Sequence, residues 1–356
     1  MIPILFEKNE TEFATNGICR LYDCTRCEVT EERNSVYEVE FDYPVDGPQF
    51  DKIYPGRIIA VEHDEKGDLQ PFDIYGYSKP IAGVVTFKAH HISYRLSEMT
   101  VTGTNITTLS GAFALFAAAE PSNPFTFDSD ITSNNYLAAA DGIPHTVREM
   151  LGGIEGSLLD SYRAEFEWDV FNVNVWASRG QEKDFTIRYG VNLVDYNEDL
   201  DFSETYTAVI PYWTGDDGNG VEITVIGDMV DSGVTTFGDR TICVPLDMTD
   251  KFESQPTTAQ LEAAAASYLE AVKPYNPSQN IVIDFVKIQD TSTEKALAGL
   301  HHFGLCDSVR VCLPRYNIDD SYKIVRVVWD VLLERYIEME LGNLSSSLAQ
   351  ALGINK

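Results

Sequence analysis

Three of the six cysteines lie close together and could hold a metal. Cys19, Cys24 and Cys27 have the C-x4-C-x2-C spacing of plant-type iron–sulfur ferredoxins. Such a cluster needs a fourth thiolate, and the next cysteine, Cys243, comes more than 200 residues later. A zinc site would need a second cysteine pair or a spaced histidine pair downstream, and the sequence has neither. The pattern favours free cysteines of a reduced chain on strand-like segments, and we expect no metal and no cofactor.

Two pairs of adjacent histidines are the next candidates, His90-His91 and His301-His302. Adjacent residues on a strand point to opposite faces, so neither pair can present both rings to one metal without a loop. We interpret each pair as one packed or hydrogen-bonded histidine and one outside. Carboxylates are plentiful, and a glycosidase would need two of them at a suitable separation, which no spacing indicates. Acids such as Glu31-Glu32 are interpreted as a solvated surface.

The common catalytic motifs are absent from the sequence. It contains no H-E-x-x-H, no G-x-S-x-G and no G-x4-G-K-[ST]. The segment that begins at Gly180 is interpreted as an ordinary turn. We therefore expect no catalytic residue, and the sequence favours an interaction or structural role over an enzyme.

Charge and composition exclude several classes of protein. The 356 residues include 26 Lys+Arg and 56 Asp+Glu, a formal net charge of −30, which opposes binding to nucleic acid through bulk electrostatics. With 44% apolar residues the chain can form a globular core. The longest weakly polar runs, 109–119 and 261–272, are shorter than the ~18 residues that span a bilayer. The N-terminal apolar stretch ends at Glu7 and does not predict a signal peptide.

Alternating residues predict short strands in the first hundred residues. Tyr37, Val39, Phe41 and Tyr43 alternate with acids, which indicates one buried face and one wet, acidic face. A hairpin turn is expected at Lys66-Gly67-Asp68. Further strands are predicted at 57–62, 72–77 and 84–90. After residue 163, two apolar runs of opposite parity predict strands separated by a turn near Asp169.

Helices and further strands follow from caps and periodicity. Leu109–Ala119 and Pro144–Leu151 are predicted helices, the second with Pro144 in the first helical position. Capping boxes at Thr257–Gln260 and Thr291–Glu294 predict helices over 258–272 and 292–299. Strands are expected at 185–189, 221–226, 309–313, 322–329 and 336–341, although 330–338 also fits a helix, and the tail 344–352 is a helix or a frayed end.

Several segments, taken in order, resemble a family of siphophage tail-tip proteins. They are 27–44, Ala89-His-His-Ile-Ser-Tyr-Arg-Leu, Tyr189-Gly-Val-Asn-Leu, Leu305-Cys-Asp-Ser-Val-Arg-Val and 330–342. The family is known as the prophage tail or tail-associated lysin N-terminal region and is also described as prophage endopeptidase tail. None of these segments is a catalytic signature, and the match rests on their shared order and spacing.

The resemblance implies a baseplate hub similar to the hub proteins of contractile phages. The expected fold is α+β and β-rich, with two similar β-barrel domains and smaller α+β peripheral domains. The implied domains are a first barrel over 1–97, a small α+β domain over 98–157, a second barrel combining 158–215 with 300–343, a peripheral insertion over 216–299 and a tail over 344–356. Three subunits would form a pseudo-sixfold ring.

The resemblance also implies partners and a place in the virion. A homotrimer at the phage tail tip, made in the bacterial host cytoplasm, would contact the distal tail protein, tail tube and tape-measure protein, and receptor-binding or lysin proteins. DNA would pass through the ring without sequence-specific binding. Longer family members carry a wall-degrading module after the hub, whereas this sequence ends at Lys356, so the enzyme name is not carried over.

Two other functions stay open at this point. One is a tail-associated cell-wall-degrading enzyme, a peptidoglycan endopeptidase or a glycosidase. The other is a receptor- or carbohydrate-binding module, for which Tyr206, Tyr212 and Trp213 are candidate residues, although aromatics at such positions more often belong to a core.

Overall fold

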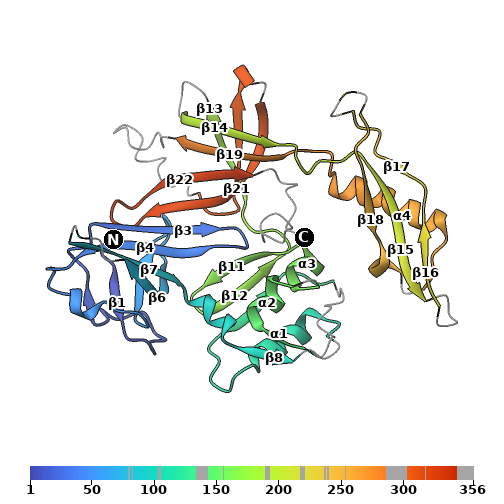
Figure 1. Ribbon diagram of the computed structural model, residues 1–356. Helices are drawn as coiled ribbons and strands as arrows, with labels where there is room; N and C mark the ends of the chain where they lie inside the picture. Colours follow the sequence, from blue (N-terminus) through green and yellow to red (C-terminus); the bar gives the residue numbers. More distant parts are fainter. Residues whose placement is uncertain are drawn as a thin grey trace. The chain divides into compact units, whose positions relative to one another are not determined.

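The computed structural model divides the chain into two compact units (Figure 1). The main unit combines Met1–Asn197 with Ile281–Gly342, and the second unit is Glu198–Asn280. The structure describes residues 1–78, 81, 83–102, 106–133, 143–154, 156–188, 193–216, 221–235, 238, 240–252, 254–285, 303–316 and 318–342. The predicted helix at 292–299, the pair His301-His302 and the predicted tail at 344–352 lie outside these residues.

A 13-stranded sheet is the largest element of the fold. Its order is β14-β19-β22-β21-β3-β4-β7-β6-β5-β1-β2, and β20 pairs with β21 and with β13. The strands are β1 (Ile4–Phe6), β2 (Cys19–Arg20), β3 (Arg26–Glu32), β4 (Tyr37–Pro44), β5 (Ile58–Glu62), β6 (Leu69–Ser78), β7 (Val84–His91), β13 (Glu182–Arg188), β14 (Leu193–Asp201), β19 (Ser278–Phe285), β20 (Ser308–Leu313), β21 (Ile318–Asp330) and β22 (Arg335–Gly342).

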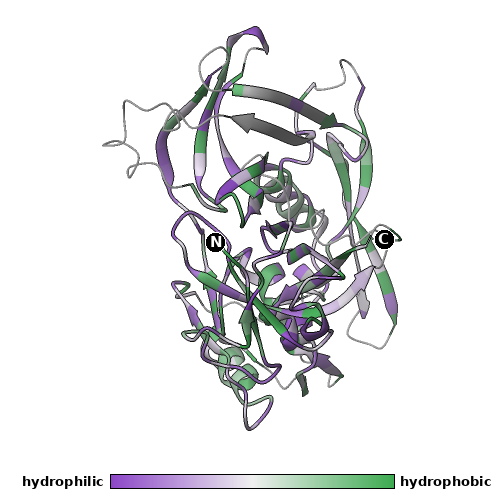
Figure 2. Cartoon of the chain, turned by 90° about the vertical axis from the view of Figure 1, so that its left-hand side faces the viewer, coloured by the Kyte–Doolittle hydropathy of each residue, from purple (hydrophilic) through white to green (hydrophobic). Residues whose placement is uncertain are grey.

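The pattern of alternating residues produces the strands that it predicts. In β4 every second residue from Tyr37 to Tyr43 is buried, and the acids between them are on the other face. Hydrophilic and hydrophobic positions alternate in the same way along neighbouring strands (Figure 2). The predicted turn at Lys66-Gly67-Asp68 joins β5 to β6, and Gly67 has a φ of +80°. The segment 330–338, which also fits a helix, ends β21, turns and begins β22.

The sheet curls on its N-terminal side. Met1, which precedes β1 at one end of the strand order, donates a hydrogen bond from its nitrogen to the Val331 carbonyl oxygen at 2.6 Å. Val331 follows β21, and its own amide donates to the Cys27 carbonyl oxygen at 2.9 Å. The part of the sheet from β21 to β1 therefore curls so that the residue before β1 contacts the residue after β21.

A smaller α+β part completes the main unit. Its strands form two sheets, one antiparallel pair and one three-stranded sheet. The elements are β8 (Thr100–Thr102), α1 (Leu109–Ala117), β9 (Thr126–Ser129), β10 (Pro144–Thr146), α2 (Val147–Gly152), α3 (Leu158–Tyr162), β11 (Glu165–Asp169) and β12 (Asn172–Trp176). Short 3-10 helices occur at Phe50–Lys52, Ile92–Ser97, Thr249–Lys251 and Pro314–Tyr316.

The predicted helix Pro144–Leu151 is wrong at its start. Residues 144–146 form β10, which pairs with β8, and the helix begins after Thr146. The Thr146 hydroxyl accepts from the Glu149 amide, and the Glu149 carboxylate accepts from the Thr146 amide. This capping box fixes the helix start more strongly than the conformational preference of Pro144 does.

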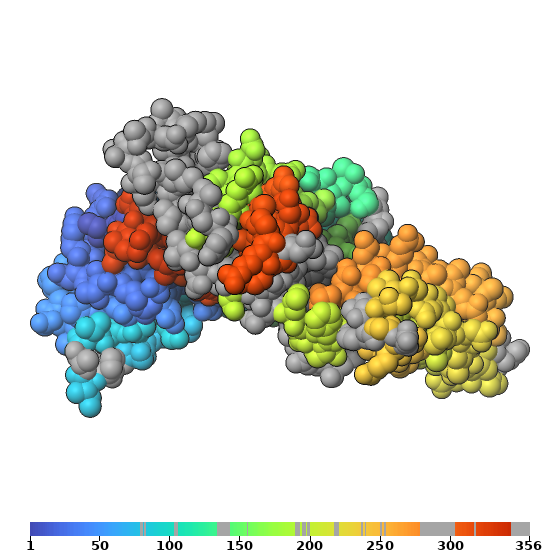
Figure 3. Space-filling model, turned by 90° about the horizontal axis from the view of Figure 1, so that it is seen from above, coloured from blue at the N-terminus to red at the C-terminus, as the bar shows by residue number. Residues whose placement is uncertain are grey.

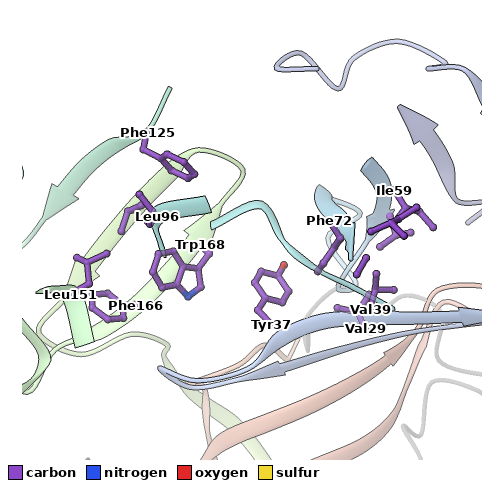
Figure 4. Packing of buried hydrophobic residues seen from close by; sticks show 14 of the residues in the cluster. Val29, Tyr37, Val39, Ile59, Phe72, Leu96, Phe125, Leu151, Phe166 and Trp168 are labelled. Carbon is purple, nitrogen blue, oxygen red and sulfur yellow. The ribbon is translucent and has the colours of Figure 1, made fainter. Parts of the chain in front are cut away.

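One continuous core joins the sheet to the α+β part. Tyr37 lies between side chains of the sheet, such as Phe72, and side chains of the α+β part, such as Trp168 (Figure 4). The turn predicted near Asp169 is at Val170, whose φ is +52°, and it returns the chain from β11 to β12. The two regions of the main unit are thus packed together by apolar contact.

The second unit is a helix packed on a small sheet. Its elements are β15 (Ala208–Asp216), β16 (Glu222–Ile226), β17 (Val230–Asp231), β18 (Cys243–Asp247) and α4 (Thr258–Val272). The helix has the bounds that its capping box predicts, with Thr257 as the N-cap. Figure 3 shows the orange surface of α4 beside the yellow strands of this unit.

Gly180 provides a test of the packing between the loop before β13 and the loop before β20. It has a φ of +83°, and a Cβ atom there would lie 2.1 Å from the Cys306 carbonyl oxygen. We predict that Gly180→Ala lowers the free energy of unfolding of the main unit by about 3 kcal/mol or more, because a backbone clash adds to the left-handed conformation.

The matched control for this prediction is Gly56→Ala. Gly56 has a φ of +93°, but a Cβ atom there would have no neighbour within 4 Å, so the substitution should cost only about 1–2 kcal/mol. Denaturant unfolding followed by tryptophan fluorescence measures both. Equal losses would contradict the predicted clash.

Candidate functional site

Strand β21 is shared between two parts of the sheet. Its first half, Ile318–Lys323, pairs with β20, and its second half, Arg326–Asp330, pairs with β3. At the change of partner, the amide of Arg33 donates to the Val325 carbonyl oxygen at 2.8 Å, and the amide of Cys306 donates to that of Ile324 at 2.8 Å. The sheet branches at this point, and β20 and β3 diverge from it.

A buried cluster of charges lies beside the branch. Lys323 Nζ contacts both carboxylate oxygens of Glu165, at 2.8 and 2.6 Å, and the two side chains are 7% and 11% exposed. Arg33 reaches Glu165 Oε1 at 3.2 Å, and the Arg179 amide donates to Oε2 at 2.6 Å. One carboxylate from β11 therefore binds the strands on both sides of the branch.

Arg179 extends this cluster to β3. Its guanidinium contacts Glu31 Oε1 at 3.0 Å and donates to the Phe166 carbonyl oxygen at 3.1 Å. Burial opposes the charge of Arg179, but the nearby carboxylates, Glu31 first among them, outweigh it and raise the pKa. Burial also raises the pKa of the neighbouring Cys306 to about 12. Glu31 is 4% exposed, so its interpretation as a solvated acid is wrong, because Arg179 compensates its charge inside the protein.

A polar cleft of about 410 Å³ opens next to the cluster. The loop before β13, the loop before β20 and the β5–β6 turn contribute most of its lining, which includes the carboxylates Glu31, Asp64, Glu167 and Asp307. The segment at Gly180, interpreted as an ordinary turn, therefore forms part of a cleft wall. Its close approach to Cys306 is a tertiary contact that local turn signals do not reveal.

The carboxylates that line the cleft all have structural contacts. Glu31 binds Arg179, and Glu167 accepts a hydrogen bond from the Trp176 indole at 2.8 Å. Asp307 accepts from the amides of Gln181 and Gly304 and pairs with Lys183. Asp64 accepts from the Lys66 amide at 2.9 Å. These bonds position the loops of the cleft.

Ser178 is an exposed residue whose hydroxyl lies beside a buried amine. Its Oγ lies 3.2 Å from Lys323 Nζ at the edge of the cleft. A serine–lysine pair can act as nucleophile and base only when the amine is neutral. Here Lys323 Nζ donates to Ser178 Oγ and to both oxygens of Glu165, so the amine is a hydrogen-bond donor and counter-ion in this structure, not a base for Ser178.

The cysteines and the pair His90-His91 have packing and hydrogen-bond contacts within the protein. All six cysteines are free, although Cys19–Arg20 and Arg26–Glu32 are separate strands joined by a turn. His91 is buried between Gln70 and the Ser93 amide, and burial lowers its pKa well below the usual value. His90, on the other face, stacks on Tyr75 and Tyr94. Among the described residues, no group of three or more His, Cys, Asp or Glu is arranged to hold a metal.

The candidate binding aromatics of the second unit contribute mainly to its core. Trp213 is 3% exposed and donates its indole hydrogen to the Phe252 carbonyl oxygen. Tyr206 packs against the core and hydrogen-bonds to Tyr268 at 2.9 Å between the two hydroxyl oxygens. Tyr212 is on the opposite face of the sheet and donates to Asp247. These three residues do not form one binding surface.

The outer face of the sheet carries a continuous belt of acids. We call it the acidic sheet face: it crosses β22, β21, β3, β4 and β7. Its basic residues are Arg26, Lys88, Arg326 and Arg335. Its acids are Glu28, Glu32, Glu38, Glu40, Asp42, Asp330, Glu338 and Glu340.

Acids on the acidic sheet face differ in their surroundings. Hydrogen bonding to Lys88 lowers the pKa of Glu40. Partial burial, reinforced by neighbouring acids, raises the pKa of Glu32 and of Glu38. The face therefore combines paired carboxylates with carboxylates that repel one another, and its eight acids outnumber its four basic residues.

The buried Lys323–Glu165 pair makes a quantitative prediction. Lys323→Met should lower the free energy of unfolding by about 3–5 kcal/mol, because Glu165 then stays buried without its main counter-ion. The exposed pair Arg310–Asp319, with side chains 56% and 51% exposed, is the matched control. Arg310→Met should cost far less, because exposed ion pairs are screened by solvent and contribute little to stability. Chemical denaturation measures both, and a small loss for Lys323→Met would contradict the assigned role of the cluster.

Comparisons with known proteins identify the fold. A prophage tail protein, gp18, from Listeria monocytogenes has a TM-score of 0.63 and 15% identity, with 99% of this chain and 97% of that chain covered. A tail protein from Neisseria meningitidis has a TM-score of 0.60 and 11% identity, over 98% of each chain. The 43 kDa tail protein of prophage MuSo2 from Shewanella oneidensis has the same TM-score and identity, over 96% of this chain and 98% of that chain.

A protein-family model matches the C-terminal part of the sequence. No curated protein matches the chain. Residues 181–352 match the model of the family described as prophage endopeptidase tail. This range includes the loop before β20, which lines the cleft, and the whole of β21. In the part of the chain that the structure describes, no helix is both long and apolar enough to cross a membrane. The expected resemblance is confirmed: residues 181–352 carry the prophage tail family's region, and the whole chain has the β-rich α+β fold of phage tail proteins.

Proposed function

We propose that this chain is a structural hub of a phage tail tip. Three copies would form a ring at the distal end of the tail tube, bound to the distal tail protein and the tube and close to the tape-measure protein. The ring would give DNA a passage during ejection and would present wall-facing proteins to the host. The protein would accordingly be located in the virion.

The observation that carries this proposal is the likeness in fold to three prophage tail proteins. It extends over 96–99% of this chain, so it includes both compact units and not a single shared module. The contacts of the cleft carboxylates agree with a structural role, since Glu31 and Asp307 hold loops in place and Glu167 joins β11 to β12. We assign no catalytic residue, no cofactor and no metal to the chain.

The acidic sheet face is the surface that we assign to the passage. Three copies carry a formal charge of 3 × (−30) = −90. Screening at physiological ionic strength limits each charge to about 8 Å, so only carboxylates that face the passage would act on DNA. A face on which acids outnumber basic residues would repel phosphates and keep the duplex from adhering to the wall.

Charge reversal on the acidic sheet face tests this assignment. We predict that tails with Glu32→Lys and Glu38→Lys eject DNA several-fold more slowly, because lysines would bind passing phosphates. Glu12→Lys with Glu98→Lys makes the same change in net charge at exposed positions outside the face, and it should leave ejection unchanged. Ejection kinetics from single particles provide the measurement. Equal slowing in both pairs, or in neither, would contradict the assignment.

The subunit count tests the hub itself. Negative-stain images and mass measurement of the purified protein or of isolated tail tips should give three copies around a central hole. A ring of threefold symmetry needs an extensive interface, of the order of 2,000 Å² for an obligate contact. A single copy in isolated tail tips would overturn the proposal.

The family's description keeps the cell-wall-degrading enzyme as the second candidate, because it includes the word endopeptidase. Ser178, at the edge of the cleft, is the hydroxyl that such an activity would most simply use. Incubation of the chain with purified peptidoglycan, with Ser178→Ala as the comparison, distinguishes the two functions. Release of muropeptides by the wild-type chain and its loss in Ser178→Ala would favour the enzyme, whereas no release is expected of a hub.

A further inference from the structure

The sheet of the second unit has one face covered by its helix. Val209 and Trp213 of β15 pack against Leu261, Ala265 and Leu269 of α4. On the flanking strands the residues that face the helix are Ile223, Val225, Val244 and Leu246. Since residues alternate between the two faces of a strand, their neighbours point away from α4.

The opposite face exposes a stripe of apolar side chains. Ile210 is 40% exposed and Ile226 is 60% exposed, and Cys243 and Pro245 are exposed beside them. The strand register places these residues side by side: Tyr212 is opposite Ile226, and Ile210 is opposite Pro245. An apolar stripe that crosses three strands on one face is the kind of surface that marks a docking site.

Acids surround this stripe. Asp247 accepts the Tyr212 hydroxyl hydrogen at 3.0 Å, and Asp231 and Glu222 occupy outward positions on the neighbouring strands. The second unit, Glu198–Asn280, contains 15 acidic and 3 basic residues, a net charge of −12, out of −30 for the whole chain. The remainder is therefore acidic as well, so a second copy would bring like charge against these acids.

We propose that this face, which we call the outer face of the second unit, docks a different protein whose surface has an apolar centre and a lysine- or arginine-rich rim. The apolar stripe would supply the desolvated centre of the interface, and Asp231, Asp247 and Glu222 would pair with the rim. This inference rests on the proposed function in one respect, because it takes the partner to be another protein of the assembled tail.

Cys243 provides a direct probe of the outer face. It is the only exposed cysteine of the six and lies on the stripe. The experiment compares the rate of maleimide labelling of Cys243 in the purified chain and in isolated tails that contain it. We expect at least a tenfold slower reaction in tails. Labelling with a benzophenone maleimide, followed by irradiation, should cross-link the chain to a protein with a basic surface patch.

Matched variants separate docking from general burial. Cys243→Ser with Ser267→Cys moves the thiol to an exposed position on α4, the other layer of the unit, and its labelling rate should be the same in tails and in the purified chain. Ile210→Ser with Ile226→Ser should abolish the protection of Cys243. Val221→Ser, at an exposed apolar residue before β16, should preserve it.

The outcomes distinguish this inference from the hub proposal. A chain that is absent from tails contradicts the proposed function and the inference with it. A chain that is present in tails but labels at Cys243 as fast as the free protein overturns the inference alone. Equal protection at positions 243 and 267, or a cross-link to a second copy of this chain, also overturns it.

Discussion

The branch in β21 is the constraint on which the main unit depends. One strand serves two sets of neighbours, and where it changes partner the two sets must separate. Backbone groups and side chains near such a separation lose regular pairing and would be costly to bury alone. Glu165 resolves this by accepting from Lys323, from Arg33 and from the Arg179 amide. A single carboxylate from the α+β part therefore joins β21, the residue that follows β3 and the loop that precedes β13.

The charge cluster around Glu165 and the neighbouring cleft share one property: their polar side chains are bound by other groups of the protein. Each carboxylate along its wall is already occupied by an amide, an indole or a cation of the protein. Buried ion pairs contribute little net stability relative to apolar packing, but they penalise alternative arrangements that leave a charge unpaired. Specific positioning of the loops is what such a cluster supplies.

Local signals predicted much of the fold. Alternation located β4, strands were also expected where β7 and β22 lie, and the capping box at Thr257 fixed the bounds of α4. A further capping box, Thr146 to Glu149, is equally visible in the sequence. It predicts the start of α2 correctly, whereas Pro144 does not. The charge cluster could not be predicted in this way. Glu31 occupies an inward position of β3, but only a cation 148 residues further along the chain makes its burial possible.

The pairing of β3 with β21 also has a consequence for biosynthesis. The two strands are about 290 residues apart, so the edge of β3 emerges from the ribosome long before its neighbour exists. At typical rates of 5–20 residues per second the interval is roughly 15–60 s. Throughout that time an apolar sheet would have an open side able to capture other nascent chains. Productive yield would then depend on how well chaperones shield the early product until translation is complete.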